Sequence, residues 1–245
     1  MSILYMISLP LELRALRRWS AGRNLSSDEG CALHHLLSET FGKGILQPFR
    51  LMVAREGRVG TLYAYTAQEQ TTLTETAYES ASPESLAVCD PARLAVKAMP
   101  TEWRTGRKLA FDIRVRPVRR LRQPVGEFTH KGAEVDAFLV ERLRRSPQTM
   151  PGEAEIGLQR DQVYAQWFAE RLGEAAQTGI IRMTRFERVQ HVRHGSARVQ
   201  GPDVTLQGEL TITDGNTFAE KLARGIGRHT AYGYGMLLLR PAQGR

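Results

Sequence analysis

The sequence predicts an α+β fold: two tandem ferredoxin-like (β-α-β-β-α-β) domains, the second degenerate, with a helical insertion between or within them. Two observations support this prediction. The first half shows strand and helix patterns in the order β-α-β-β-α-β, and the second half repeats parts of that order in a weaker form. The length of 245 residues suits two small domains, and a hydrophobic fraction of 42% suffices for a buried core.

The first domain is expected over residues 1–122. Apolar and polar residues alternate in its strand segments, and Ser26 with Glu29 forms a capping box that predicts the start of a helix. In chain order, the expected elements are a strand at Ile3–Leu9, a helix at about Ser27–Phe41, strands at Phe49–Ala54 and Arg58–Thr66, a short helix near Pro83–Cys89, and a closing strand over 109–116. Residues 70–97 are otherwise mixed in pattern.

Residues 123–155 are expected to form a basic connector and an inserted helix, and residues 156–245 the second domain. Thr217 with Glu220 forms another capping box. The expected elements are helices at about Ala133–Arg145, at about Asp161–Ala176 and from Thr217 to Gly225, an alternating strand around Val204–Ile212, and a final strand at Tyr234–Leu239.

Positive charge dominates the sequence. Lys and Arg number 34 against 26 Asp and Glu, a net charge of +8, and 29 of the cations are Arg. Between Trp103 and Arg122, eight cations face only Asp112, so this segment carries eight minus one, or +7. A second basic cluster comprises Arg182, Arg185, Arg188, Arg193 and Arg198 with His191 and His194. A GC-rich genome would raise the arginine content but would not cluster it. Guanidinium groups pair with phosphate oxygens, so nucleic acid is the favoured partner and an anionic membrane surface a distant second.

Several classes of protein are disfavoured. No apolar run reaches the roughly 18–20 residues that span a membrane, and the first residues lack the order and cleavage site of a signal peptide. We therefore expect a cytoplasmic protein without membrane contact. Cys31 and Cys89 are too few for a disulfide framework or a cysteine-based zinc site. No HxxxH, DxD or carboxylate cluster has metal-ligand spacing, so no metal or other cofactor is expected.

The most specific local motif is GIGRHTAYGYG, residues 225–235, between a short helix and a strand. Its glycines let the backbone approach a ligand closely and expose N–H donors. A Rossmann nucleotide site needs a strand before the glycines and a helix after them, and the order here is reversed. A glycine-rich turn that only packs against the sheet is the structural alternative.

The stretch GIGRHTAYGYGMLLLRP resembles the C-terminal glycine-rich motif of the CRISPR repeat endoribonucleases, which cut precursor CRISPR RNA. VTLQGELTITDGNTFAEKLARGIG is similar to the strand and helix before that motif in the CasE subunit of type I-E systems. Further segments resemble its first helix, the closing strand of its first half and the helix that begins its second half: LHHLLSETF, RVRPVRRL and YAQWFAERLGEAA. The longer basic approach to the first helix and the helix at 133–145 depart from this pattern. They would fit a diverged relative, such as the repeat nuclease of type IV systems, and the sequence leaves both memberships open.

The resemblance implies two ferredoxin-like domains and a metal-independent ribonuclease that binds a repeat hairpin. Such an enzyme cleaves by attack of a ribose 2′-OH and leaves a 2′,3′-cyclic phosphate and a 5′-OH. The resemblance further implies that the protein stays bound to the mature CRISPR RNA with other effector-complex subunits. A non-catalytic RNA-binding scaffold of the same fold is the alternative function, and it differs only at the catalytic residues.

The catalytic histidine of this family lies in the first helix and its motif matches His34. If Leu33, Leu36 and Leu37 form the buried stripe, His34 lies at its border, roughly 100° from Leu33, whereas His35 lies roughly 200° away and faces solvent. Histidine titrates near neutral pH and can serve in either proton transfer. A half-buried structural histidine is the alternative.

An arginine is expected to assist or replace histidine in a diverged site. Its pKa exceeds about 12, so it is a poor base, but it can orient the 2′-OH and neutralise the phosphorane. Arg23 is the candidate because Gly22 and Asn24 make its loop adaptable.

The predicted RNA contacts come from the basic clusters, the inserted helix and the glycine-rich segment. An A-form stem is recognised mainly by its shape and phosphates, which suits arginine-rich surfaces. The predicted contacts are Arg17, Arg18, Arg114, Arg116, Arg119, Arg120, Arg122, Arg142, Arg145, Arg193, His194, Arg224, Gly225, Gly227, Arg228, His229 and Tyr232.

Overall fold

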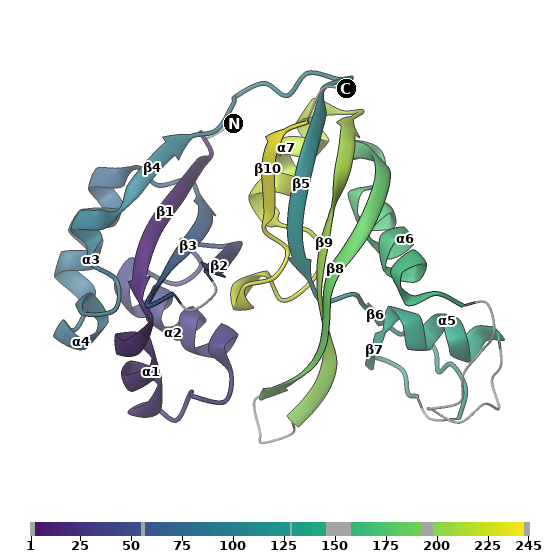
Figure 1. The fold of residues 1–245 in the computed structure, drawn as a ribbon, viewed down its shortest axis with the longest axis horizontal. Helices are drawn as coiled ribbons and strands as arrows, with labels where there is room; N and C mark the ends of the chain where they lie inside the picture. The colour runs from purple at the N-terminus through teal and green to yellow at the C-terminus, as the bar shows by residue number, and fades with distance from the viewer. Residues whose placement is uncertain (1–2, 55–56, 128, 146–157, 193–197, 243–245) are drawn as a thin grey trace.

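Two four-stranded antiparallel sheets stand side by side in the computed structural model, which describes residues 3–54, 57–127, 129–145, 158–192 and 198–242 (Figure 1). The strand orders are β2-β3-β1-β4 and β10-β5-β9-β8. In each sheet the first strand in the chain pairs with the third and the fourth, and the third also pairs with the second. Both sheets therefore share the ferredoxin-like topology, which confirms the predicted fold class.

The first domain surrounds the sheet formed by β1 (Tyr5–Glu12), β2 (Phe49–Val53), β3 (Val59–Thr66) and β4 (Ala95–Ala98). Its helices are α1 (Leu13–Ala21), α2 (Glu29–Phe41), α3 (Gln70–Ser80) and α4 (Pro83–Leu86), followed by a 3₁₀ turn, η1 (Pro91–Arg93). Ile7 and Leu9 of β1 are fully buried and share one core with Leu33 and Leu36 of α2 and Leu73 of α3. The predicted leucine stripe of α2 thus faces the sheet.

The second domain surrounds the sheet formed by β5 (Lys108–Val115), β8 (Ala176–Val192), β9 (Arg198–Ile212) and β10 (Leu237–Pro241). Its helices are α6 (Arg160–Leu172) and α7 (Gly215–Arg224), with 3₁₀ turns η2 (Gly173–Ala175) and η3 (Thr230–Tyr232). The predicted stripe of Tyr164, Phe168 and Leu172 on α6 is fully buried. The ring of Phe168 lies 4.9 Å from that of Phe111 on β5, between their centroids, so this helix covers the sheet.

The insertion lies within the second domain. β6 (Val118–Arg120), β7 (Glu134–Asp136) and α5 (Ala137–Arg145) follow β5 and precede α6, and β6 pairs with β7 (Figure 1). Trp167 of α6 donates from Nε1 to the carbonyl of Val118 at 3.2 Å, which anchors this unit to the domain. Across the described ranges, no helix combines the length and apolar character needed to cross a membrane.

The strand predicted over 109–116 forms as β5, but it belongs to the second sheet. It pairs with β9 and β10, while β4 closes the first sheet beside β1. The chain leaves the first sheet at Ala98 and enters the second at Lys108, which corrects the boundary expected after residue 122. Alternation predicts a half-buried strand, but the choice of sheet depends on long-range partners that a local pattern does not encode.

The N-cap residues of two helices also differ from the prediction. Asp28 caps α2 by accepting from the backbone N of Cys31 at 3.0 Å, and Asp214 caps α7 by accepting from the N of Thr217 at 2.6 Å. The predicted capping boxes at Ser26 and Thr217 are therefore wrong, because an aspartate takes the cap at each helix.

Two helices of the first domain have no counterpart in the prediction. Helix α1 lies in the basic segment before α2 and buries Leu16 and Trp19, whereas α3 buries only Leu73 and Ala77. Such short or narrow apolar stripes give a weak periodic signal.

Polar contacts join the two domains along β2, β3, β5 and β10. Tyr65 of β3 donates its hydroxyl to the carbonyl of Leu237 at 2.8 Å, and Arg50 of β2 forms an ion pair with Asp112 of β5. The hydroxyl of Tyr65 is buried, so this junction is a packed interface and not a loose linker contact. Figure 1 shows the chain after α7 between the two halves.

Candidate active site and nucleic-acid interface

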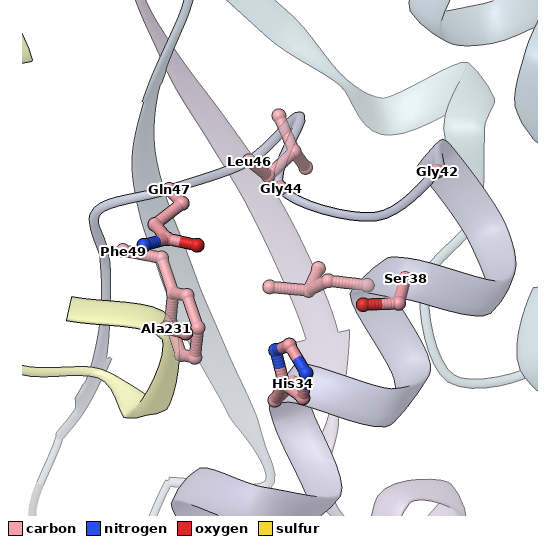
Figure 2. A pocket seen from close by; sticks show the side chains of 9 residues that line it. His34, Ser38, Gly42, Gly44, Leu46, Gln47, Phe49 and Ala231 are labelled. Atoms are coloured by element: carbon pink, nitrogen blue, oxygen red, sulfur yellow. The ribbon is translucent and has the colours of Figure 1, made fainter. Parts of the chain in front are cut away.

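A small pocket lies beside α2 at the junction of the domains (Figure 2). His34 and Ser38 reach it from α2, Gln47 and Phe49 from the segment after α2, and Ala231 from η3 of the second domain. Leu37, Gly42, Gly44 and Leu46 complete the lining. Because both domains contribute to the lining, their packing decides the shape of the pocket.

His34 is half-buried and His35 is exposed, as the helical geometry predicts. The pKa of His34 is lowered from its ordinary value, first by burial, which disfavours the imidazolium, and then by the charges of His35 and Lys43. A hydrogen bond with the backbone of Ala231 acts in the opposite direction. A backbone bond that favours the charged ring is one donated to a carbonyl, which leaves the second ring nitrogen as an acceptor. His34 is therefore suited to take up a proton near neutral pH.

The turn at Thr230–Tyr232 packs directly against α2. The ring centroids of His34 and Tyr232 are 5.1 Å apart, and Nε2 of Gln47 donates to Oγ1 of Thr230 at 2.8 Å. A Cβ on Gly30 would lie 2.5 Å from the carbonyl oxygen of Tyr232, so only glycine permits this approach. These contacts set the position of Ala231 relative to His34.

The glycine-rich segment has a structural role in addition to any ligand contact. Gly225 and Gly227 have positive φ angles of 78° and 90°. A Cβ would lie 2.9 Å from Thr230 at the first position and 2.8 Å from the Trp167 ring at the second. Packing alone thus requires glycine at both predicted RNA-binding positions.

Arg228 and His229 of the same segment contact the insertion. Nε2 of His229 lies 2.9 Å from Oε2 of Glu134 on β7, and Arg228 forms an ion pair with the same carboxylate. The hydrogen bond from His229, followed by the charges of His229 and Arg228, lowers the pKa of Glu134 to about 2. An ionised carboxylate therefore faces Arg228 and His229, two residues that the sequence predicts as RNA contacts.

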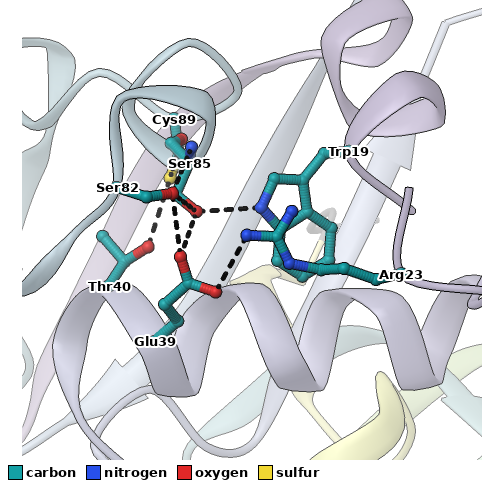
Figure 3. A network of polar contacts seen from close by, with 7 residues as sticks. All are labelled: Trp19, Arg23, Glu39, Thr40, Ser82, Ser85 and Cys89. Atoms are coloured by element: carbon teal, nitrogen blue, oxygen red, sulfur yellow. Dashed lines mark hydrogen bonds and ion pairs between the residues drawn. The ribbon is translucent and has the colours of Figure 1, made fainter. Parts of the chain in front are cut away.

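Arg23 belongs to a different network (Figure 3). Its Nη2 lies 3.5 Å from Oε2 of Glu39, and its guanidinium stacks over Trp19 at 4.2 Å from the ring centroid. Glu39 also accepts the Ser85 hydroxyl at 2.7 Å. Glu39 follows His34 by five residues, so the two project roughly 140° apart around α2. Arg23 does not line the His34 pocket, and the structure does not bring the two predicted catalytic residues together.

Arg114 and Arg116 are not displayed as a phosphate-binding surface. Arg114 donates from Nε and Nη2 to the fully buried Asp203 at 2.9 and 2.6 Å and lies over the Tyr234 ring. Arg116 is only 4% exposed, and a Cβ on Gly201 would collide with its guanidinium. This corrects the prediction for these two arginines: because both are largely buried, we assign them to the structure of the second domain.

The other predicted contacts are more accessible. Arg119 and Arg142 are half-buried, and Arg119 pairs with Glu170 at 2.8 Å. The exposed members are Arg17, Arg18, Arg120, Arg122, Arg145, Arg224 and Arg228. Arg193 and His194, with the turn expected there, lie outside the described residues. The exposed arginines therefore remain available for RNA.

Several residues at this site carry no signal that sequence reasoning could use. Glu134, Gln47 and Asp203 act on partners from distant segments. The constraint on Gly30 comes from Tyr232, a residue of the other domain. In the described parts of the chain, no three His, Cys, Asp or Glu side chains gather as a metal site would require.

This chain is a protein of the paired ferredoxin-like class. It has a histidine at the junction of its two domains, a glycine-rich segment and exposed arginines. The chain belongs to the CRISPR-associated protein family, since the family model described as "CRISPR associated protein" matches residues 4–241. Among curated proteins, no relative matches the chain significantly.

Solved structures share this fold at low sequence identity. The CRISPR endoribonuclease Cse3 bound to a 19-nucleotide RNA aligns with a TM-score of 0.68 and 18% identity over 98% of this chain and 100% of its own. The CRISPR-associated protein Cas6e from Escherichia coli K-12 aligns with a TM-score of 0.58 and 19% identity, over 97% and 100%. A chain of a CRISPR RNA-guided surveillance complex aligns with a TM-score of 0.56 and 14% identity, over 97% and 100%.

Proposed function

We propose that this protein is a metal-independent endoribonuclease that binds the CRISPR repeat hairpin and cuts precursor CRISPR RNA into guide RNAs. Cleavage proceeds by attack of a ribose 2′-OH and leaves a 2′,3′-cyclic phosphate and a 5′-OH. The observation that carries this proposal is the position of His34, half-buried at the domain junction against Ala231 and Tyr232. Membership of the CRISPR-associated family supports a role in this system, and the fold shared with the CRISPR endoribonuclease Cse3 supports ribonuclease activity.

His34 acts as the general base in this reaction. Its lowered pKa keeps the ring neutral near pH 7, and the bond to Ala231 orients it with one nitrogen as acceptor. The 2′-OH gives its proton to that nitrogen as its oxygen attacks the adjacent phosphorus. The bond from phosphorus to the 5′ oxygen then breaks, and that oxygen takes up a proton from water.

The phosphorane needs positive charge nearby. Lys43 lies close enough to His34 for its charge to lower the pKa of the imidazole, so it can also stabilise a developing anion at this pocket. Arg23 is held by Glu39 and Trp19 outside the pocket, and we therefore assign removal of the 2′-OH proton to His34 without help from Arg23.

Mapping the product ends of a repeat RNA tests the proposal. Purified protein is incubated with the repeat RNA of its own genome in EDTA, and a single cut with a cyclic phosphate is expected. His34→Ala should lower the single-turnover rate by about 10²–10⁴-fold with hairpin affinity nearly unchanged. His35→Ala, on the same helix but exposed, is the matched control and should cleave normally at pH 8.

Other outcomes separate the alternatives. Tight binding without a cut would favour an RNA-binding scaffold and make His34 a structural residue. Loss of cleavage in EDTA would indicate a metal-dependent nuclease.

We also propose that the protein keeps its product and joins an RNA-guided effector complex. The fold that it shares with a chain of a surveillance complex supports this role. Co-elution of the cleaved guide RNA with the protein after a single turnover tests it, and release of both fragments would contradict it.

A further inference from the structure

The insertion and α6 form a second concave surface apart from the His34 pocket. A groove there is lined by residues of β6, the connector after it, α5 and α6. Its cationic side chains, which we call the arginine groove, are Arg119, Arg120, Arg122, Arg144 and Arg171. Leu121, Gln123, Pro124 and Val125 complete the lining, and none of them is acidic.

The arginines of this groove are largely available for a ligand. Arg120, Arg122, Arg144 and Arg171 are exposed. Among the described residues, the Nε of Arg119 is a buried donor that has no hydrogen-bond partner. The acidic partners nearby are few: Glu170 pairs with Arg119 at 2.8 Å, and Glu141 lies 3.7 Å from Arg144. A site with this excess of positive charge favours a ligand that carries several negative charges.

The paired strands β6 and β7 connect the groove to the glycine-rich segment. Arg120 lies opposite Glu134 in the pairing of β6 with β7, and Glu134 contacts Arg228 and His229. The turn after His229 lies in contact with α2 beside His34. The Glu134 contacts therefore link the groove to the segment that borders the His34 pocket.

We propose that the arginine groove binds the phosphodiester backbone of the RNA at a point remote from the cut. This inference rests on the proposed function, because it takes the substrate from that function. Forked guanidinium groups from three elements suit successive phosphates, and contacts to phosphates position an RNA without reading its sequence. The groove thus contributes affinity and orientation, and the His34 pocket carries the chemistry.

A charge-matched pair of variants tests the proposal. The groove variant combines Arg122→Ala, Arg144→Ala and Arg171→Ala. The control removes the same net charge from exposed positions elsewhere on the described surface, with Arg58→Ala, Lys97→Ala and Arg240→Ala. Binding of the repeat hairpin and of an unrelated RNA duplex is measured from 50 to 300 mM salt.

The groove variant should bind both RNAs at least about tenfold more weakly, and the slope of log K against log salt should fall by about 0.9 for each phosphate that the variant no longer neutralises. The single-turnover rate at saturating protein should change less than about threefold. A variant with Arg→Lys at the same three positions should keep most of the salt slope, because it keeps the charge. Thermal unfolding of all three variants checks that the exposed substitutions leave the fold intact.

Three outcomes separate the two proposals. If the groove variant and the control bind both RNAs alike, the groove is no RNA site, and an acidic protein partner becomes its better explanation. If the wild-type protein fails to cut the repeat but the groove variant still binds the unrelated duplex more weakly, the proposed function fails and the groove stands. If the groove variant cleaves more slowly at saturation but binds with unchanged affinity, the inference is overturned, because the groove then belongs to the catalytic site.

Discussion

The imidazole of His34 lies against the phenol ring of Tyr232, with 5.1 Å between their centroids, although the two residues belong to different domains. Gly30 makes this approach possible one turn earlier on α2, because its missing side chain leaves room for the carbonyl of Tyr232. The candidate active site is therefore a product of domain packing. Changes to that packing should alter chemistry more than RNA affinity.

The pH dependence of cleavage should show a base with a low pKa. Because burial and neighbouring charges lower the pKa of His34, kcat/KM should rise with pH and level off with a midpoint below the ordinary histidine value of about 6.5. Rates at subsaturating RNA from pH 4.5 to 8.5 check this. His35→Ala should move the midpoint upward, since it removes one cause of the lowered pKa. A midpoint above about 6.5 would contradict the lowered pKa of His34, and a rate that falls as the pH rises would instead indicate that His34 acts as an acid.

Gly30→Ala should slow cleavage about 10- to 100-fold while hairpin binding stays nearly unchanged. The new Cβ would lie 2.5 Å from backbone of the other domain, and a displacement of about 1 Å at a reacting group can cost 10²-fold in rate. Gly22→Ala is the matched control, because its Cβ would meet only ordinary contacts at 3.8 Å. Single-turnover assays compare the cleavage rates of the two variants. Equal rates would show that the close approach of η3 to α2 is not required for cleavage.

Asp203→Asn should lower the free energy of unfolding by about 3 kcal/mol, because it leaves the Arg114 guanidinium, 21% exposed, without its buried counter-charge. Glu187→Gln serves as the control. It breaks an ion pair with Arg185 in which both side chains are about half exposed, so the decrease should stay below about 1 kcal/mol. Urea unfolding measures both. If the free energy of unfolding falls by a similar small amount in both variants, Arg114 has no structural need for Asp203 and returns as a candidate RNA contact.

Arg23→Ala should leave the single-turnover rate within about threefold of wild type, because Arg23 pairs with Glu39 and stacks on Trp19, away from the His34 pocket. Glu39→Gln should have the same small effect, since it breaks the same ion pair from the other side. Rates at saturating protein provide the check. A hundredfold decrease in Arg23→Ala alone would restore Arg23 as a catalytic residue.

The candidate site shows where sequence reasoning succeeds and where it stops. The border position of His34 follows from helical periodicity alone, since Leu33, Leu36 and Leu37 are buried as predicted. The roles of Arg114 and Arg116 do not follow, because a basic run looks the same whether its members face solvent or a buried aspartate. Asp203 lies far along the chain from Arg114, and only the pairing of β5 with β9 brings them together.

Sequence patterns predict the α+β class, the two ferredoxin-like units and the buried faces of α2 and α6, and the resemblance to the CRISPR repeat endoribonucleases singles out His34. These features depend on periodicity and short motifs, which are local properties of the chain. Three features depend on packing in three dimensions: β5 belongs to the second sheet, Glu134 contacts Arg228 and His229, and arginines from three elements line one groove. Such contacts join residues distant in the chain, and their partners are set by the packing of whole elements.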